Sequence, residues 1–237
     1  MYPVTKTKEP PKIKPALTTC DKPIAKSIPE PLPKSCFRML IIGRPGSGKS
    51  ALSAAFLLKG GPYHRVFDRI WAIVPPNSRE SYKKDPFKGH DRVYDELTPE
   101  ILERVIEESK QLASEGKHGL LYIDDQAYAL KNKRIEQLLR LIYFNSRHMH
   151  LSSIIISQTL RQVGVNIRKT ASHLLTYEPA NRLESKVIAE EYLYLDLASA
   201  AALFEQAFQK RFDHLLINTG ERRAYINFDE VTLPRSF

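Results

Sequence analysis

The octapeptide Gly43-Arg44-Pro45-Gly46-Ser47-Gly48-Lys49-Ser50 decides how the rest of this chain is interpreted. It fits the pattern G-x-x-x-x-G-K-[ST], in which glycines allow backbone N–H groups to turn inward around a phosphate. Lys49 is expected to reach the β and γ phosphates of a nucleotide, and the Ser50 hydroxyl to ligate Mg²⁺. The alternative interpretation of these eight residues is a glycine-rich surface turn, which would not require any particular flanking structure.

The residues on either side of the loop predict a strand before it and a helix after it. Residues 37–42 (FRMLII) form a short apolar run that stops at Gly43, as a buried strand would. Residues 50–58 have a helical pattern, and the positive end of such a helix favours a bound phosphate. This context favours a nucleotide-binding loop, with ATP as the expected ligand.

Further along the chain, predicted strands alternate with predicted helices. Strands are expected at residues 69–74, 120–123, 154–157 and 173–177, and a helix is expected to begin at Thr98-Pro99. Apolar residues spaced i, i+3, i+4 and i+7 predict another helix around residues 135–142. Helical stretches at 183–192 and 198–208 and a hairpin over 213–228 close the chain. The pattern predicts an α/β fold: a P-loop NTPase core with a mainly parallel sheet flanked by helices, then C-terminal helices and a β-hairpin.

Two predicted strands end in polar side chains that suit nucleotide chemistry. Residues 119–125 (GLLYIDD) end in Asp124, placed to hold Mg²⁺, and Asp125, placed to polarise an attacking water. Gln158 follows the strand at 154–157, where an amide can hydrogen-bond the γ-phosphate or the water. Strand ends of a parallel sheet meet at one edge, which would bring these residues to the phosphate loop. The alternatives are a helix-capping acid pair and an ordinary polar strand end.

Three arginines follow the acidic pair, and phosphoryl transfer gains from a cation placed on the γ-phosphate. They are Arg147, Arg161 and Arg168. Any one of them can instead be a solvated surface residue or a contact to nucleic acid. The residues alone do not choose among these roles.

The sequence segments around these residues resemble those of a known protein family. Residues 145–152 (NSRHMHLS), the apolar strand with Gln158, and residues 167–171 (IRKTA) resemble the genome-packaging ATPases of eukaryotic DNA viruses and virophages. These belong to the FtsK–HerA group of ring-shaped DNA pumps, and the resemblance covers about residues 37–178. It implies an additional-strand ATPase core in which Asp124 and Asp125 match the paired acids and Gln158 the sensor. Arg147 is then the first candidate for an arginine finger, and Arg168 the second.

The resemblance also implies a function and partners. It predicts an ATP-hydrolysing motor that moves double-stranded DNA into a preformed capsid. The motor is expected to work as a homo-oligomeric ring of five or six subunits that docks on a capsid vertex protein. Other open functions are a different DNA-dependent P-loop ATPase, of helicase or partition type, and a slow nucleotide-gated DNA-binding subunit. The expected location is the host cytoplasm or nucleus at sites of virus assembly, or the virion.

Composition limits the remaining possibilities. The 36 basic and 27 acidic side chains give a net charge of +9, which favours a polyanionic partner. Cys20 and Cys36 have neither metal-ligand nor disulfide-framework spacing, which favours a reducing compartment. No apolar run reaches the length of a membrane-spanning helix.

Residues 1–35 hold eight of the 16 prolines and seven lysines. They are predicted to be an extended or disordered arm, either a solvated tail or a contact to DNA or capsid, before an ATPase domain at 36–237.

Overall fold

A nine-stranded sheet organises the computed structural model, which describes residues 24–25, 27–34 and 36–233. The strands lie in the order β3-β2-β4-β5-β1-β6-β7-β8-β9, and neighbours from β3 to β6 are parallel while β6 to β9 are antiparallel. The strands are β1 (Arg38–Ile42), β2 (Arg69–Ile73), β3 (Val93–Tyr94), β4 (Gly119–Asp124), β5 (Leu151–Ser157), β6 (His173–Thr176), β7 (Leu215–Asn218), β8 (Arg223–Ile226) and β9 (Asp229–Val231). The predicted fold class, mainly parallel with a closing hairpin, is confirmed.

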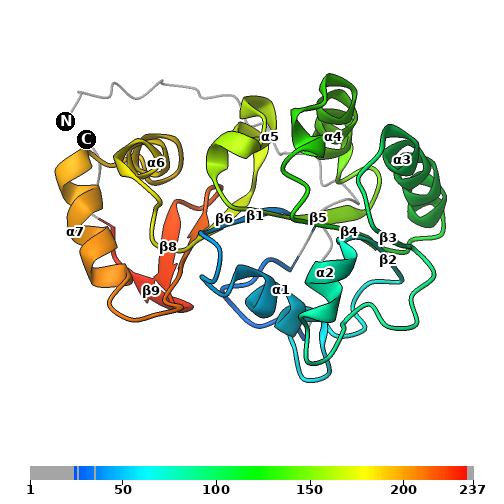
Figure 1. Ribbon diagram of the computed structural model, residues 1–237, viewed down its shortest axis with the longest axis horizontal. Coiled ribbons are helices and arrows are strands. Elements are labelled where there is room, and N and C mark those ends of the chain that lie inside the picture. The colour runs from blue at the N-terminus through cyan, green and yellow to red at the C-terminus, as the bar shows by residue number, and fades with distance from the viewer. Residues whose placement is uncertain (1–23, 26, 35, 234–237) are drawn as a thin grey trace, which may run out of the picture.

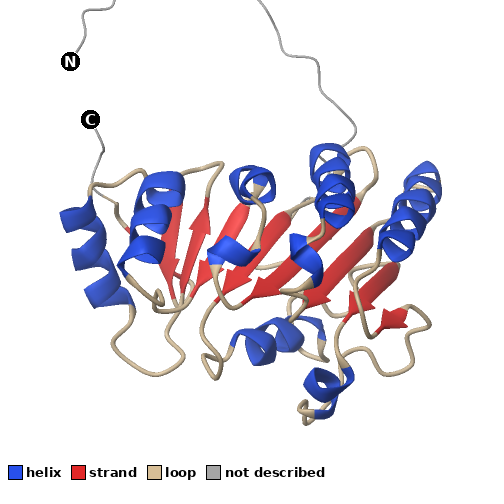
Figure 2. Cartoon of the chain, turned by 45° about the horizontal axis from the view of Figure 1, so that its top comes forward, coloured by secondary structure: helices blue, strands red, loops and turns tan. Residues whose placement is uncertain are grey.

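Helices cover both faces of the sheet (Figure 1). One face carries α1 (Lys49–Leu57) and α2 (Pro76–Glu80), and the other carries the remaining helices. These are α3 (Pro99–Ser114), α4 (Lys133–Asn145), α5 (Val165–Thr170), α6 (Arg182–Ile188) and α7 (Leu197–Ala207), with a π-helical turn at Ala189–Leu193 and 3₁₀ turns at Ala129–Lys131 and Leu160–Gln162. Figure 2 shows this layering with the strands in one continuous surface. None of the helices described is long and apolar enough to span a membrane.

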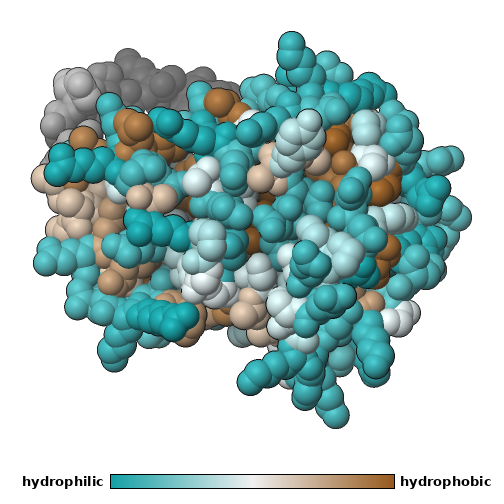
Figure 3. Space-filling view, in the orientation of Figure 1, coloured by the Kyte–Doolittle hydropathy of each residue, from teal (hydrophilic) through white to brown (hydrophobic). Residues whose placement is uncertain are grey.

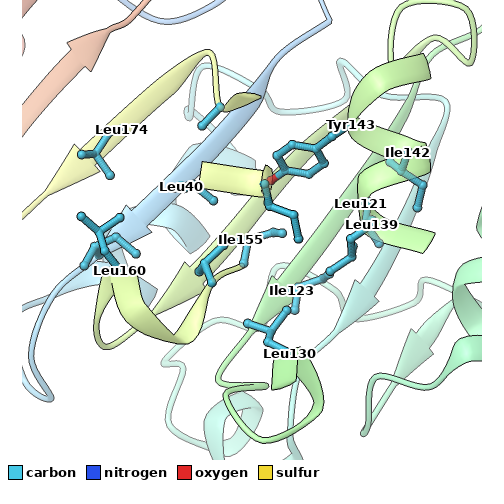
Figure 4. Packing of buried hydrophobic residues seen from close by; sticks show 14 of the residues in the cluster. Leu40, Leu121, Ile123, Leu130, Leu139, Ile142, Tyr143, Ile155, Leu160 and Leu174 are labelled. Carbon is cyan, nitrogen blue, oxygen red and sulfur yellow. The ribbon is translucent and has the colours of Figure 1, made fainter. Parts of the chain in front are cut away.

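Each face of the sheet has its own apolar core. The stripe predicted around residues 135–142 is buried on α4, where Leu139 and Ile142 pack over β4 and β5 (Figure 4). On the other face, aromatic side chains such as Phe37 and Tyr63 pack with α1 and β1. Every residue of β5, and every residue of β1 except Arg38, is buried, as expected for central strands that are covered on both faces.

The strand order places β5 between β1 and β4. Ile42, the last residue of β1, is in register with Ser157, and Asp124, the last residue of β4, is in register with Ile156. The additional-strand core that the resemblance implies is therefore present. The carboxyl ends of three strands meet at one edge.

The N-terminal arm predicted over residues 1–35 is wrong for the part that the structure describes. Ile28 and Leu32 are 2% and 7% exposed and belong to the apolar core on the α1 face. The Tyr63 hydroxyl donates a hydrogen bond to the Pro33 carbonyl at 3.0 Å. Proline prevents a regular helix here but does not prevent apolar side chains between the prolines from packing. Residues 1–23 of the predicted arm lie outside the described residues.

Candidate nucleotide-binding and catalytic site

The phosphate loop joins β1 to α1 and has the backbone conformation that its glycines permit. Gly46 and Gly48 have φ angles of 76° and 98°, in the left-handed region that side-chain-bearing residues rarely adopt. Gly48 is also the N-cap residue of α1, so the first amide groups of that helix point into the loop. The Lys49 Nζ donates a hydrogen bond to the Arg44 carbonyl at 3.4 Å, which places the ammonium group across the loop.

Asp124 ends β4 in a buried position beside this loop. The residue is 1% exposed, and its Oδ1 atom accepts no hydrogen bond from the described part of the chain. Burial raises the pKa of Asp124, while the neighbouring Ser50 hydroxyl and the Lys49 ammonium lower it in part. The fold therefore brings Ser50 and Asp124 together and leaves one carboxylate oxygen available for a cation.

Asp125 and Gln158 meet at the same edge from neighbouring strands. The Gln158 Nε2 donates a hydrogen bond to the Asp125 Oδ1 at 3.3 Å. Asp125 is exposed and has a φ angle of 52°, so the chain leaves the extended conformation of β4 at this residue. The Gln158 backbone N–H donates to the Gln162 Oε1 at 3.2 Å, within the capping box that starts the turn after β5. These contacts hold an exposed carboxylate and an amide next to the phosphate loop.

Of the three candidate arginines, Arg161 is exposed in the turn that follows β5 at this edge, whereas Arg147 and Arg168 lie elsewhere. Arg147 is exposed in the turn between α4 and β5, which lies at the amino ends of the parallel strands. Arg168 is 8% exposed, and its Nη2 lies 3.6 Å from the Glu191 Oε1. This guanidinium is buried against an acid of its own subunit, which argues against Arg168 as a second finger.

Two residues of the site were not predicted from the sequence. The Tyr82 hydroxyl, in the segment between α2 and β3, donates to the Asp124 Oδ2 at 3.3 Å. Burial, and next the Asp124 charge, raise the pKa of Tyr82, so its hydroxyl remains a donor. Gln126 is buried and joins the turn after β4 to the Leu97 N–H at 3.0 Å. Tyr82 lies 42 positions before its partner with no motif around it, whereas the polar residue directly after the acid pair was a usable signal for Gln126.

A sheet with an added strand between the phosphate-loop strand and the acid-bearing strand, and polar groups at all three strand ends, defines an additional-strand P-loop NTPase. The family described as Poxvirus A32 protein matches residues 27–220, so the chain belongs to that family. This match begins within the segment that packs under β1, before the phosphate loop.

Solved structures share the fold. The genome packaging NTPase B204 from Sulfolobus turreted icosahedral virus 2, in complex with ATPγS, aligns with a TM-score of 0.58 and 17% identity, over 80% of this chain and 96% of that one. The DNA-packaging ATPase B204 from Sulfolobus Turreted Icosahedral Virus aligns with a TM-score of 0.59 and 19% identity over the same shares. The pCW3 conjugation coupling protein TcpA aligns with a TM-score of 0.58 and 15% identity, over 82% of this chain and 58% of that one. No curated protein matches the sequence.

Proposed function

We propose that this chain is the ATP-hydrolysing motor that drives double-stranded viral DNA into a preformed capsid. The observation that carries the proposal is the meeting of the phosphate loop, Asp124, Asp125 and Gln158 at one sheet edge in a chain of the Poxvirus A32 protein family. The B204 packaging ATPases share this fold over almost their full length. A phosphate loop alone would support only nucleotide binding, because many functions use one fold.

The residues at the loop fit a bound Mg²⁺ ion. Asp124 offers a buried carboxylate oxygen without a hydrogen-bond partner in the described chain, and the Ser50 hydroxyl is its neighbour. Hard oxygen ligands of this kind are those that Mg²⁺ prefers in nucleotide sites. Ser50 and Asp124 would hold the ion, which supplies charge neutralisation on the phosphates when bound.

Asp125 and Gln158 would handle the attacking water. Asp125 is exposed to the site and keeps a carboxylate that can accept a proton from water, and the Gln158 amide holds that carboxylate in place. Because Gln158 directly follows β5, which lies between the loop strand and the acid strand, a change at the γ-phosphate would reach the turn after β5 directly. Lys49 would bind the β and γ phosphates from the loop.

Arg147 would act on the nucleotide of a neighbouring subunit. Between it and its own phosphate loop lies the seven-residue strand β5, a length of roughly 20 Å. The same corner of the molecule exposes Leu141 and Phe144 on α4, at 45% and 63%. Exposed apolar residues beside a cation suit a contact with a second copy, and a ring of such contacts, of five or six subunits, would place each arginine at the next phosphate loop.

The net charge of +9 suits DNA as the polymer that the ring moves. A capsid vertex protein would be the docking partner, at the sites of virus assembly in the infected cell. A helicase would share the ATPase chemistry, so the decisive measurement must separate pumping from unwinding.

The test is ATP turnover with and without double-stranded DNA, together with a forked-duplex unwinding assay. We expect DNA to stimulate turnover, forks to remain paired, and Lys49→Ala to abolish turnover while the circular dichroism spectrum is unchanged. Displacement of labelled DNA strands would favour a helicase. The proposed motor would be ruled out if ATP turnover were unchanged by DNA, or if Lys49→Ala retained turnover.

A further inference from the structure

An exposed aromatic ring lies against the phosphate loop. Phe212, in the loop between α7 and β7, is 53% exposed. A β-carbon at Gly48 would lie 2.9 Å from the Phe212 Cδ1, so the ring touches the loop directly at a residue whose lack of a side chain makes the approach possible. The mechanism proposed for ATP hydrolysis assigns no role to the Phe212 ring.

The backbone of Phe212 is fixed by the fold. Its φ angle is 74°, a left-handed conformation that is rare for an aromatic residue and that persists only where surrounding contacts hold it. Asp213 provides those contacts, because its Oδ2 accepts from the Lys210 N–H at 2.7 Å and its Oδ1 accepts from the Asn227 Nδ2 at 2.8 Å. The closing hairpin thus holds an apolar ring in solvent beside the phosphate loop.

A cavity of about 210 Å³ separates this ring from the first residues of the phosphate loop. Its walls include residues 44–47, Tyr177, and Phe208 and Lys210 from the loop that carries Phe212. The Arg44 Nη2 donates to the Pro179 and Ala180 carbonyls at 3.0 and 2.8 Å, which fixes the wall opposite. The Arg211 guanidinium lies 4.7 Å from the centre of the Phe212 ring.

We propose that this cavity binds the base of the nucleotide and that Phe212 is the ring on which the base packs; the inference rests on the proposed ATPase function. The cavity adjoins the loop that would hold the phosphates, so one nucleotide can occupy both. The Arg211 guanidinium lies over one face of this ring, and the other face suits packing against the π-face of a nucleobase. A bound nucleotide would then contact the loop before the closing hairpin through Phe212, and the sheet edge through Asp124.

The experiment compares ATP with inorganic tripolyphosphate, which has the phosphates but no base, by calorimetry on the full chain. Phe212→Ala should weaken ATP binding by about tenfold, as loss of base stacking does, and leave tripolyphosphate binding unchanged. Phe212→Tyr should bind both as the wild type does. The matched control is Tyr194→Ala, because Tyr194 is also a partly exposed aromatic with positive φ and an arginine, Arg222, over its ring.

A direct measurement uses the photoreactive analogue 8-azido-ATP, which labels residues beside the base. We expect the label in the tryptic peptide of residues 212–222. The base site is overturned if Phe212→Ala weakens both ligands equally, if it weakens neither, or if the label falls elsewhere. Failure of the wild type to bind ATP at all, with DNA binding intact, would instead overturn the proposed ATPase function.

Discussion

Two neighbouring carboxylates at the end of β4 have opposite surroundings. Asp124 is buried, next to Ser50 and Lys49, whereas Asp125 is exposed and contacts Gln158. Adjacent acids in such different environments take different tasks. The positive φ of Asp125 is the backbone feature that separates the two side chains.

The first prediction follows from that difference. Asp125→Asn should retain ATP binding and slow hydrolysis by about 10²- to 10⁴-fold, because only proton acceptance is lost. Asp124→Asn should instead weaken Mg²⁺-dependent nucleotide binding. Equilibrium binding of a fluorescent nucleotide and single-turnover hydrolysis measure the two effects. If Asp125→Asn loses binding and Asp124→Asn keeps it, the roles are reversed.

A second prediction concerns Tyr82, whose hydroxyl donates to the Asp124 Oδ2. A partner of this kind orients a metal-ligating carboxylate, and its loss typically reduces metal affinity by about tenfold or more. Tyr82→Phe should therefore raise the Mg²⁺ or Mn²⁺ concentration needed for nucleotide binding, as measured by Mn²⁺ titration. Tyr128→Phe is the control, since Tyr128 is 91% exposed. Equal metal dependence in both variants would contradict the role.

At the scale of elements, the proline-rich start of the described chain behaves as part of the core. Ile28 and Leu32 contribute to the same apolar cluster as Phe56 of α1 and Phe37 before β1. The segment thus covers the helix that follows the phosphate loop. Its removal would expose that face, so a truncation meant to remove a tail must stop before residue 24.

The third prediction tests this packing. Ile28→Ala should lower the free energy of unfolding by about 2–4 kcal/mol, through lost burial and a residual cavity. Lys34→Ala, which breaks only an exposed ion pair with Glu30, should cost less than about 1 kcal/mol. Denaturant unfolding curves of both variants make the comparison. An Ile28→Ala curve that overlays the wild type would return the segment to the status of a tail.

At the scale of the whole molecule, the sheet separates two working edges. The phosphate loop, the acids and Gln158 occupy the carboxyl ends of the strands, and Arg147 occupies the amino ends. The face seen in Figure 3 is mainly hydrophilic, with apolar side chains in separate patches. In the proposed head-to-tail ring, these two edges of neighbouring subunits would face each other.

The fourth prediction is that Arg147→Ala binds ATP normally and hydrolyses it about 10³-fold more slowly. Mixing it with Lys49→Ala subunits should restore some turnover, because one subunit keeps a sound phosphate loop and its neighbour keeps a sound arginine. Turnover is measured across mixing ratios in assembled rings. No recovery of turnover at any ratio would mean that Arg147 acts on the nucleotide of its own subunit or has only a structural role.

The fifth prediction concerns global stability and pH. Burial, and next the charge of Arg38, lower the pKa of His173 from 6.5 to about 4. Between these values the unfolded chain binds a proton that the folded chain excludes, so stability falls as pH falls, by up to about 3 kcal/mol. His173→Gln should remove this part of the pH dependence, whereas the exposed His90→Gln should not. Parallel curves for His173→Gln and wild type would contradict the assignment.

The parts of this protein that depend on local chemistry could be predicted from the sequence. The phosphate loop needs glycines and a lysine at fixed spacing, and the strand that ends in Asp124 is an uninterrupted apolar run. Periodicity predicted α3 with its Thr98 cap, whose side chain accepts from the Ile101 N–H, and the buried stripe of α4. The two-residue strand β3 and the short strand β9 were missed because so few residues show no period.

Contacts between residues that are far apart in the sequence could not be predicted in this way. Tyr82, Phe212 and Ile28 have no motif around them, and they join the site or the core because the crossover, the closing hairpin and the N-terminal segment fold back onto the phosphate-loop unit. Burial likewise separated Arg147 from Arg168, which look alike in the sequence. Local pattern records the period of an element, whereas contacts between elements depend on strand order, and strand order is set by packing the whole sheet at once.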